Sequence, residues 1–196
     1  RYDQGYLLGQ RHFKDMREHS DVRMITVHDA CFANDLATRS MYRLIKFDDI
    51  PTQAITDGLE TMERRLRQAV GKNAPAHVLS AYRLLLETGS HDVNVLRGAF
   101  GNPARVLHTE IWPGGNWLST TLDYGGDVRC NLTIARTARN WPDEFITAYG
   151  LENTVTVEFP NPFHKNAATV VRRTFMDGDS TTYQTTKASH EEAFEA

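Results

Sequence analysis

Apolar residues recur at helical spacing through the first half of the chain. Tyr6, Leu7, Phe13 and Met16 predict an amphipathic helix over residues 3–18. The apolar, β-branched run from Val22 to His28 predicts a strand, and residues 29–50 are expected to form mostly loop. Apolar positions followed by glycines predict further helices over 51–70, 75–87 and 93–98.

In the second half the apolar positions alternate with a period of two. This alternation predicts strands over 106–111, 117–124, 128–135, 145–149, 154–159, 169–175 and 182–186. Glycine-containing turns such as Gly125-Gly-Asp127 and Asp177-Gly178 favour hairpins between them. Helices followed by hairpin-linked strands predict an α+β fold, an open and mostly antiparallel β-sheet with helices packed on one face.

Composition narrows the range of partners. With 40% hydrophobic and 24% charged residues, the sequence is that of a globular protein. A formal net charge of -3 provides no basic field for nucleic acid, and no apolar run reaches the roughly 18 residues that span a membrane. Cys31 and Cys130 have no recognisable metal-ligand or disulfide spacing. We therefore expect a cytoplasmic protein with no metal, nucleic-acid or membrane partner.

The chain has the size of one domain, and we expect 1–196 to be a single domain cut from a longer protein. It begins with Arg1, and residues 190–196 have the pattern of a helix cut short. No G-x-G-x-x-G sequence and no strand–helix–strand alternation occur, so the sequence contains no dinucleotide-binding unit of its own.

One polar cluster stands between two apolar runs, at Glu87-Thr-Gly-Ser-His91-Asp92. A carboxylate four residues before a histidine lies on the same side of a helical turn, where it can hold the imidazole in one tautomer for proton transfer. A histidine at a helix junction, bonded to a nearby carbonyl, explains the same spacing. His28, followed by Asp29, ends the first predicted strand, where side chains often line a pocket.

Several motifs, in order along the chain, resemble the Gfo/Idh/MocA family, the group of glucose–fructose oxidoreductase and inositol dehydrogenase. These are Arg1-Tyr2-Asp3-Gln-Gly5-Tyr6, Val27-His28-Asp29, the stretch from Glu87 through His91 to Val106, and the strand pair from Ala148 to Pro160. The third of these motifs, from Glu87 to Val106, resembles the family's acid-x-x-x-His helix with its following Gly-x-Pro turn. The resemblance spans nearly the whole chain.

The resemblance implies the C-terminal, substrate-binding and oligomerisation domain of an NAD(P)-dependent oxidoreductase acting on the CH–OH group of a sugar, polyol or inositol. His91 matches the family's general acid/base, and Glu87 matches its acidic partner, which is usually Asp. We also assign Tyr2, His28 and Asp92 to substrate binding. NAD or NADP belongs to the full-length protein, whose nucleotide-binding domain and final helix lie outside this chain.

Two further expectations follow from that arrangement. The chain alone is inactive, because hydride transfer needs both domains. It forms a homodimer or homotetramer through the open face of its sheet, where aromatic residues provide contact area. A non-enzymatic ligand-binding or oligomerisation module is the alternative favoured by Glu in place of Asp. A stand-alone isomerase or dehydratase using Glu87 and His91 is another.

Overall fold

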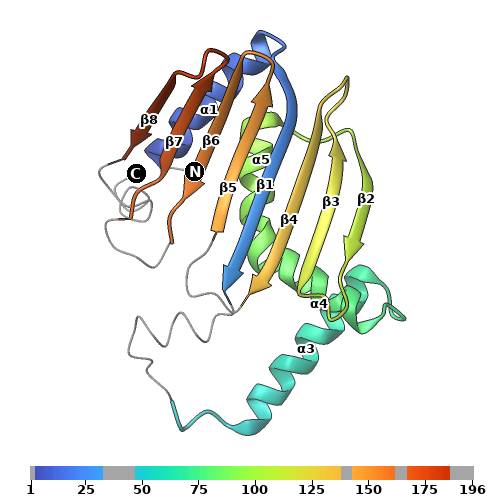
Figure 1. Cartoon of the computed structure of the whole chain (residues 1–196). Coiled ribbons are helices and arrows are strands. Elements are labelled where there is room, and N and C mark those ends of the chain that lie inside the picture. Colours follow the sequence, from blue (N-terminus) through green and yellow to red (C-terminus); the bar gives the residue numbers. More distant parts are fainter. Residues whose placement is uncertain (1–2, 33–46, 138–142, 162–166, 186–196) are drawn as a thin grey trace.

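A single sheet of eight strands organises the molecule, in the order β2-β3-β4-β1-β5-β6-β7-β8 (Figure 1). The computed structural model describes residues 3–32, 47–137, 143–161 and 167–185. Its strands are β1 (Val22–Phe32), β2 (Arg105–Ile111), β3 (Trp117–Asp123), β4 (Arg129–Thr137), β5 (Asp143–Gly150), β6 (Asn153–Phe159), β7 (Val170–Phe175) and β8 (Ser180–Gln184). Its helices are α1 (Gln4–Glu18), α3 (Thr52–Val70), α4 (Ala76–Leu84), the π-helical turn η1 (Leu85–Gly89) and α5 (Ser90–Phe100).

The central strand β1 joins the two halves of the sheet. It pairs antiparallel with β5 and parallel with β4, whereas the other neighbouring strands are antiparallel. A parallel pair needs a long crossover, and here the helices and the β2–β3 hairpin separate β1 from β4. This topology confirms the expected α+β fold with a mostly antiparallel sheet.

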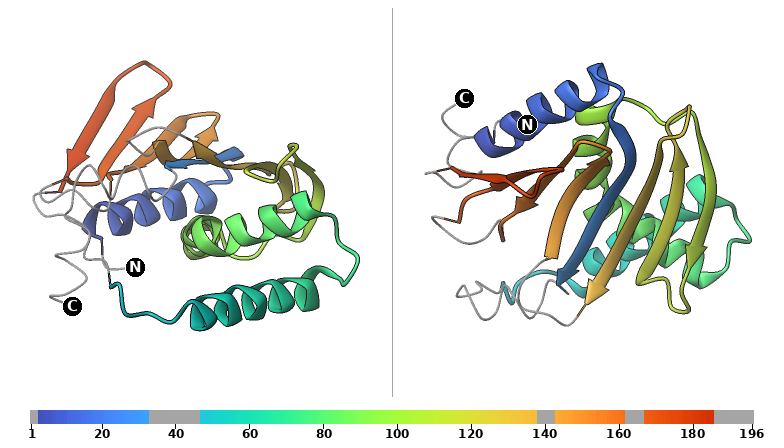
Figure 2. Two further views of the ribbon diagram at one scale, coloured as in Figure 1. Left: turned by 90° about the horizontal axis from the view of Figure 1, so that it is seen from below. Right: turned by 45° about the horizontal axis from the view of Figure 1, so that its top comes forward.

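Helices α1 and α5 lie side by side on one face of the sheet, and no described helix covers the other face (Figure 2). The core lies between these layers. Its almost completely buried side chains come from both the sheet and the helices. They include Phe13, Met16, Ile25, Leu84, Leu96, Ile134, Ile146, Val155 and Val157. Burial of this apolar surface is the main favourable contribution to folding.

Helix α1 is fixed to the sheet by its first residues. The Asp3 carboxylate accepts a hydrogen bond from the Tyr6 amide at 2.6 Å, as an N-cap residue does, and a second from the Thr169 hydroxyl at 2.7 Å. At Gly9 an added Cβ would lie 2.3 Å from the Val157 side chain, so a glycine is needed for α1 to approach β6 this closely.

Two expectations about element boundaries were wrong. Strand β1 continues to Phe32 and does not end at His28, because Asp29 and Ala30 pair with both β4 and β5, and the last two residues pair with β4. Gly89 does not end a helix: residues 76–100 form one continuous helix in which η1 separates α4 from α5. An added Cβ at Gly89 would lie 2.3 Å from the Ile134 side chain, so this glycine allows the helix to pack closely on β4.

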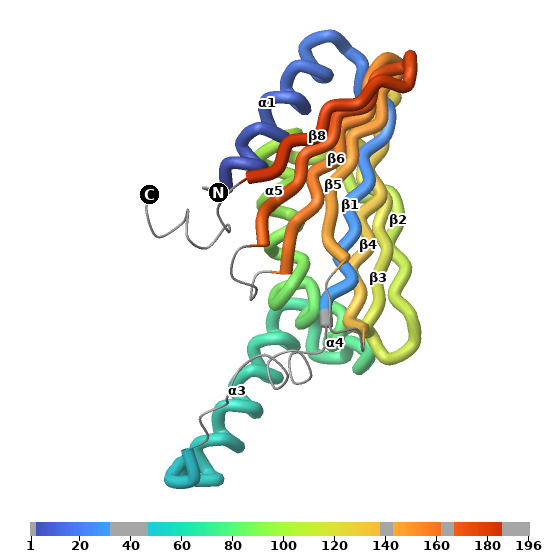
Figure 3. The backbone as a smooth tube through the Cα atoms, turned by 60° about the vertical axis from the view of Figure 1, so that its left-hand side comes forward, coloured from blue at the N-terminus to red at the C-terminus, as the bar shows by residue number. Residues whose placement is uncertain are grey.

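Helix α3 projects from the body of the molecule (Figure 3). It packs against α4, and none of its side chains is buried. Its apolar residues Ile55 and Leu59 are more than half exposed. Within the described residues, no helix combines the length and the apolar character needed to cross a membrane.

Candidate functional site

The predicted polar cluster meets the sheet where β1 and β4 end. Glu87, on η1, accepts hydrogen bonds from Arg83 Nε at 2.6 Å and from Arg136 Nη2 at 2.5 Å. Arg136 lies on β4, opposite Cys31 of β1. The Cys31 thiol in turn lies 3.5 Å from the Thr88 hydroxyl of η1. These contacts attach the π-helical turn to two parallel strand ends.

The two arginines determine the charge state of Glu87. Burial raises the pKa of its carboxyl group, but the hydrogen bonds and charges of Arg83 and Arg136 outweigh that effect and hold the pKa below its usual value. Glu87 is therefore an ionised carboxylate that is paired with two arginine guanidinium groups. Such a group anchors its neighbours well and is a weak proton acceptor.

His91 occupies the first turn of α5, with its side chain exposed. Among the residues that the structure describes, none forms a hydrogen bond with its ring, so the expected Glu87–His91 pair is not formed. The π-helical turn contributes to this separation: its i→i+5 hydrogen bonds change the angle between Glu87 and His91 from that of a regular α-helix. His91 is left accessible to a ligand.

Asp92 points the opposite way, into the protein, and is 2% exposed. There it meets Asp29 of β1 and lies near Glu144 of β5. Neither of these two carboxyl groups was assigned to the site from the sequence. Asp29 stood beside a noted histidine, but its partners come from distant parts of the chain, so no local pattern indicated the cluster.

The structure does not bring His28 together with the helix residues. Successive side chains of a strand point to opposite faces, so His28 lies on the open face of the sheet while Asp29 faces the helices. The His28 ring stacks on Phe145 with 5.2 Å between ring centres, and its Nε2 is 3.6 Å from an Asp143 carboxylate oxygen. Tyr2 lies outside the described residues.

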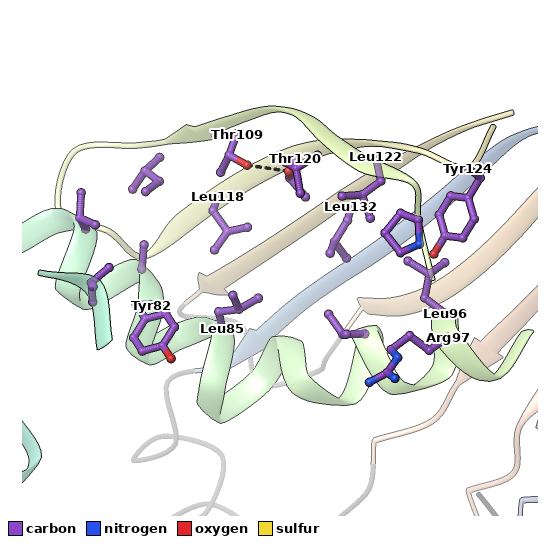
Figure 4. A pocket seen from close by; sticks show the side chains of 17 residues that line it. Tyr82, Leu85, Leu96, Arg97, Thr109, Leu118, Thr120, Leu122, Tyr124 and Leu132 are labelled. Carbon is purple, nitrogen blue, oxygen red and sulfur yellow. Dashed lines mark hydrogen bonds between the residues drawn. The ribbon is translucent and has the colours of Figure 1, made fainter. Parts of the chain in front are cut away.

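An apolar pocket of about 390 Å³ lies between the α4–α5 helices and strands β2, β3 and β4 (Figure 4). Most of its lining is apolar. Two of its polar lining residues, Thr109 and Thr120, are hydrogen-bonded to each other at 2.6 Å, and the others are Tyr82, Arg97 and Tyr124. Glu87 and His91 are not among its lining residues. A sugar or polyol needs many hydrogen-bond partners, so this pocket is unsuited to such a substrate.

A metal site finds no support in the described part of the chain, where no group of three or more His, Cys, Asp or Glu side chains is arranged to hold an ion. No protein-family model and no curated protein matches the sequence.

Comparison with solved structures gives a consistent result. An oxidoreductase from Pseudomonas syringae is 11% identical, with a TM-score of 0.54, over 92% of this chain and 40% of its own. An inositol dehydrogenase homologue from Azotobacter vinelandii, complexed with NAD+, is 11% identical, with a TM-score of 0.56, over 93% of this chain and 41% of its own. The chain thus spans about two fifths of the length of these structures.

At such low identity the likeness concerns the fold. The described sheet and its helices have the fold of one part of these two solved structures.

Proposed function

We propose that this chain is the substrate-binding and oligomerisation domain of an NAD(P)-dependent oxidoreductase acting on the CH–OH group of a sugar, polyol or inositol. The likeness of almost the whole chain to part of two oxidoreductases is the observation that carries the proposal. The exposed His91 at the sheet end supports it, because the imidazole is free to receive a substrate hydroxyl.

Within this proposal, His91 is the general acid/base. In the oxidation direction, an imidazole nitrogen takes the proton of the substrate hydroxyl as the carbonyl forms. Glu87 is a positioning residue: its ion pairs with Arg83 and Arg136 hold η1 against β4, and η1 leads directly into the turn that carries His91. The proposed substrate therefore approaches from the exposed side of α5.

NAD(P) supplies the hydride acceptor when it is bound. The sequence has no glycine-rich strand–helix unit to hold the dinucleotide, so its residues do not fit the cofactor by themselves. The proposal accordingly places cofactor binding in another domain of a longer protein and expects this chain alone to be inactive.

The open face of the sheet is the proposed subunit interface. Met24 and Tyr149 are paired in register on the two middle strands, β1 and β5, and are 38% and 37% exposed. Trp117 on β3 is 45% exposed. Aromatic and methionine side chains are enriched in protein interfaces, which makes this face a better candidate than the charged surface of α3.

A polyol titration tests the assignment of the site. In the isolated 15N-labelled chain, myo-inositol is expected to shift the NMR signals of residues 87–92 and to leave those of α3 unchanged. The variant His91→Gln is expected to weaken this response about tenfold, whereas His19→Gln, which changes an exposed histidine just after α1, has no effect. A response that is confined to other elements, or that persists unchanged in His91→Gln, rejects the assignment.

Activity measurements separate the competing functions. Turnover of a polyol or sugar by the isolated chain without nucleotide supports a stand-alone acid/base enzyme and rejects the proposal. Polyol binding by the full-length gene product without reduction of NAD+ or NADP+ supports the non-enzymatic ligand-binding module. That module is favoured by one observation, the engagement of the Glu87 carboxylate by two arginines.

A further inference from the structure

Three carboxyl groups from three elements gather beneath the first turn of α5. Asp29 of β1 stands opposite Glu144 in the β1–β5 register, so both side chains lie on the helix-covered face. Asp92 of α5 meets them from the helix side, close enough to Asp29 for a hydrogen bond between the two side chains. Asp29 and Asp92 are 3% and 2% exposed.

No cation balances these groups in the part of the chain that the structure describes. The nearest arginine on the same sheet face, Arg136 of β4, is paired with Glu87 of η1. Cys31 of β1 bonds to Thr88 and Ala135, and Asp143 of β5 lies on the open face with His28. One oxygen of Asp92, Oδ2, is fully buried without a hydrogen-bond partner.

This arrangement differs from the other buried carboxylates of the chain. Asp21 accepts hydrogen bonds from three backbone amides, and Asp123 is paired with Arg105 and Arg129. Two ionised carboxylates both accept hydrogen bonds and donate none. The bond between Asp29 and Asp92 therefore requires a proton on one of them.

We propose that Asp29 and Asp92 share one proton, and that this shared proton holds the first turn of α5 against the end of β1 and so positions His91. Asp29 and Asp92 are thus positioning residues. The shared proton stands independently of the proposed function, whereas the role given to His91 rests on it.

The pKa directions agree with this geometry. Burial raises the pKa of Asp29 to about 6, against a smaller lowering by its hydrogen bond to Asp92. Burial first, and the Asp29 charge second, raise the pKa of Glu144 to about 8. Burial, followed by the charges of Asp29 and Glu144, raises the pKa of Asp92 well above its usual range.

The sign of the pH effect follows from these directions. A carboxyl group whose pKa is raised in the folded state binds more protons when folded than when unfolded. The contribution of these groups to the stability of the fold is then fully present below the ordinary carboxyl pKa. It falls as pH rises through the folded-state pKa values of about 6 for Asp29 and about 8 for Glu144. Alkaline pH places like charges together beneath α5.

The decisive experiment compares the melting temperatures of wild type and Asp92→Asn from pH 5 to pH 9. The asparagine amide donates permanently to Asp29 and replaces the shared proton. The wild-type melting temperature is expected to fall as pH rises through this range. The melting temperature of Asp92→Asn is expected to change much less and to exceed that of wild type at pH 9.

Asp123→Asn is the matched control. It makes the same substitution at another buried aspartate, but the partners of Asp123 are arginines. It is expected to lower the melting temperature at both ends of the pH range. An Asp92→Asn melting curve as steep in pH as wild type, or lower at pH 9, overturns the shared proton. If the variant does not fold, titration of the wild-type carboxyl groups by 13C NMR provides the same test. Independent titration of Asp29 and Asp92 near pH 4 would overturn the shared proton.

Positioning of His91 has its own readout. Amide hydrogen exchange of residues 90–94, corrected for the intrinsic pH dependence of exchange, is expected to accelerate between pH 6 and pH 9 in wild type and to stay slow in Asp92→Asn. If exchange there is unchanged while the melting temperatures behave as expected, the positioning role is rejected and the shared proton stands. Failure of the polyol titration rejects the proposed function and leaves both of these results unaffected.

Discussion

A single carboxylate at Asp21 holds the turn between β5 and β6. It accepts hydrogen bonds from the amides of Leu151, Glu152 and Asn153 at 2.6, 2.8 and 3.1 Å. The preceding Gly150 leaves room for it, since an added Cβ would lie 2.2 Å from the carboxylate. The position combines a close backbone approach with a charged acceptor.

Replacement of Asp21 by Ala is expected to lower the free energy of unfolding by about 2–3 kcal/mol, because hydrogen bonds to a charged group are lost and buried donors lose their partner. Burial raises the pKa of Asp21, but the hydrogen bonds that its carboxylate accepts outweigh this effect and hold the pKa below its usual value. Its contribution is therefore present above about pH 4 and lost as pH falls. Urea unfolding at pH 7 and pH 3 tests this, and an equal loss at both values contradicts it.

At this scale the sequence singled out candidate residues but not their surroundings. Glu87, His91 and Asp92 were chosen as candidates from one local cluster, because neighbours on one helix are visible in a local pattern. The arginine that fixes Glu87 and the acids that surround Asp92 come from β4, β1 and β5, far away along the chain. Only the strand register brings them together, and local spacing carries no information about register.

Helices α3 and α4 show how tertiary contact determines the value of an apolar residue. Leu59 of α3 is 56% exposed, whereas Leu84 of α4 is 1% exposed and belongs to the core. Both are leucines in helices, so replacement by alanine changes helix propensity by the same small amount.

Leu84→Ala is expected to lower the free energy of unfolding by about 2–5 kcal/mol, because it removes buried surface and leaves a cavity. Leu59→Ala is expected to change it by less than about 0.5 kcal/mol. Chemical denaturation of the two variants measures both. A loss of more than about 1 kcal/mol in Leu59→Ala would mean that α3 packs against another part of the molecule.

The hydrophobic periodicity predicted which helices and strands exist, whereas packing across the sheet determined where they begin and end. The period-two segments from residue 106 onward are the observed strands to within a few residues, since half-buried strands show their pattern locally. The parallel β1–β4 pair and the continuous helix through Gly89 depend on contacts across the sheet. Local turn chemistry favoured a break at Gly89, and close packing against Ile134 explains why a glycine stands there instead.

At the scale of the whole molecule, helices cover one face of the sheet (Figure 2). The other face bears exposed aromatic side chains such as Tyr149 and Trp117. The proposed interface explains this asymmetry. On its two middle strands, β1 and β5, it carries the exposed Met24–Tyr149 pair and, further along the same face, the stacked His28 and Phe145 rings. If two copies meet there, a charge at the centre would be buried without a partner, which is costly.

Tyr149→Arg is therefore expected to halve the solution mass of the chain, measured by sedimentation equilibrium over a concentration series, while its unfolding at high dilution changes little. Leu59→Arg is the control, since it places the same charge at another exposed apolar position, on α3, and is expected to leave the mass unchanged. A wild-type chain that stays monomeric throughout the series, or an oligomer that survives Tyr149→Arg, contradicts the proposed interface. Dissociation by Leu59→Arg alone would instead place the contact on the projecting helix α3, with the exposed Ile55 and Leu59 covered by the second copy.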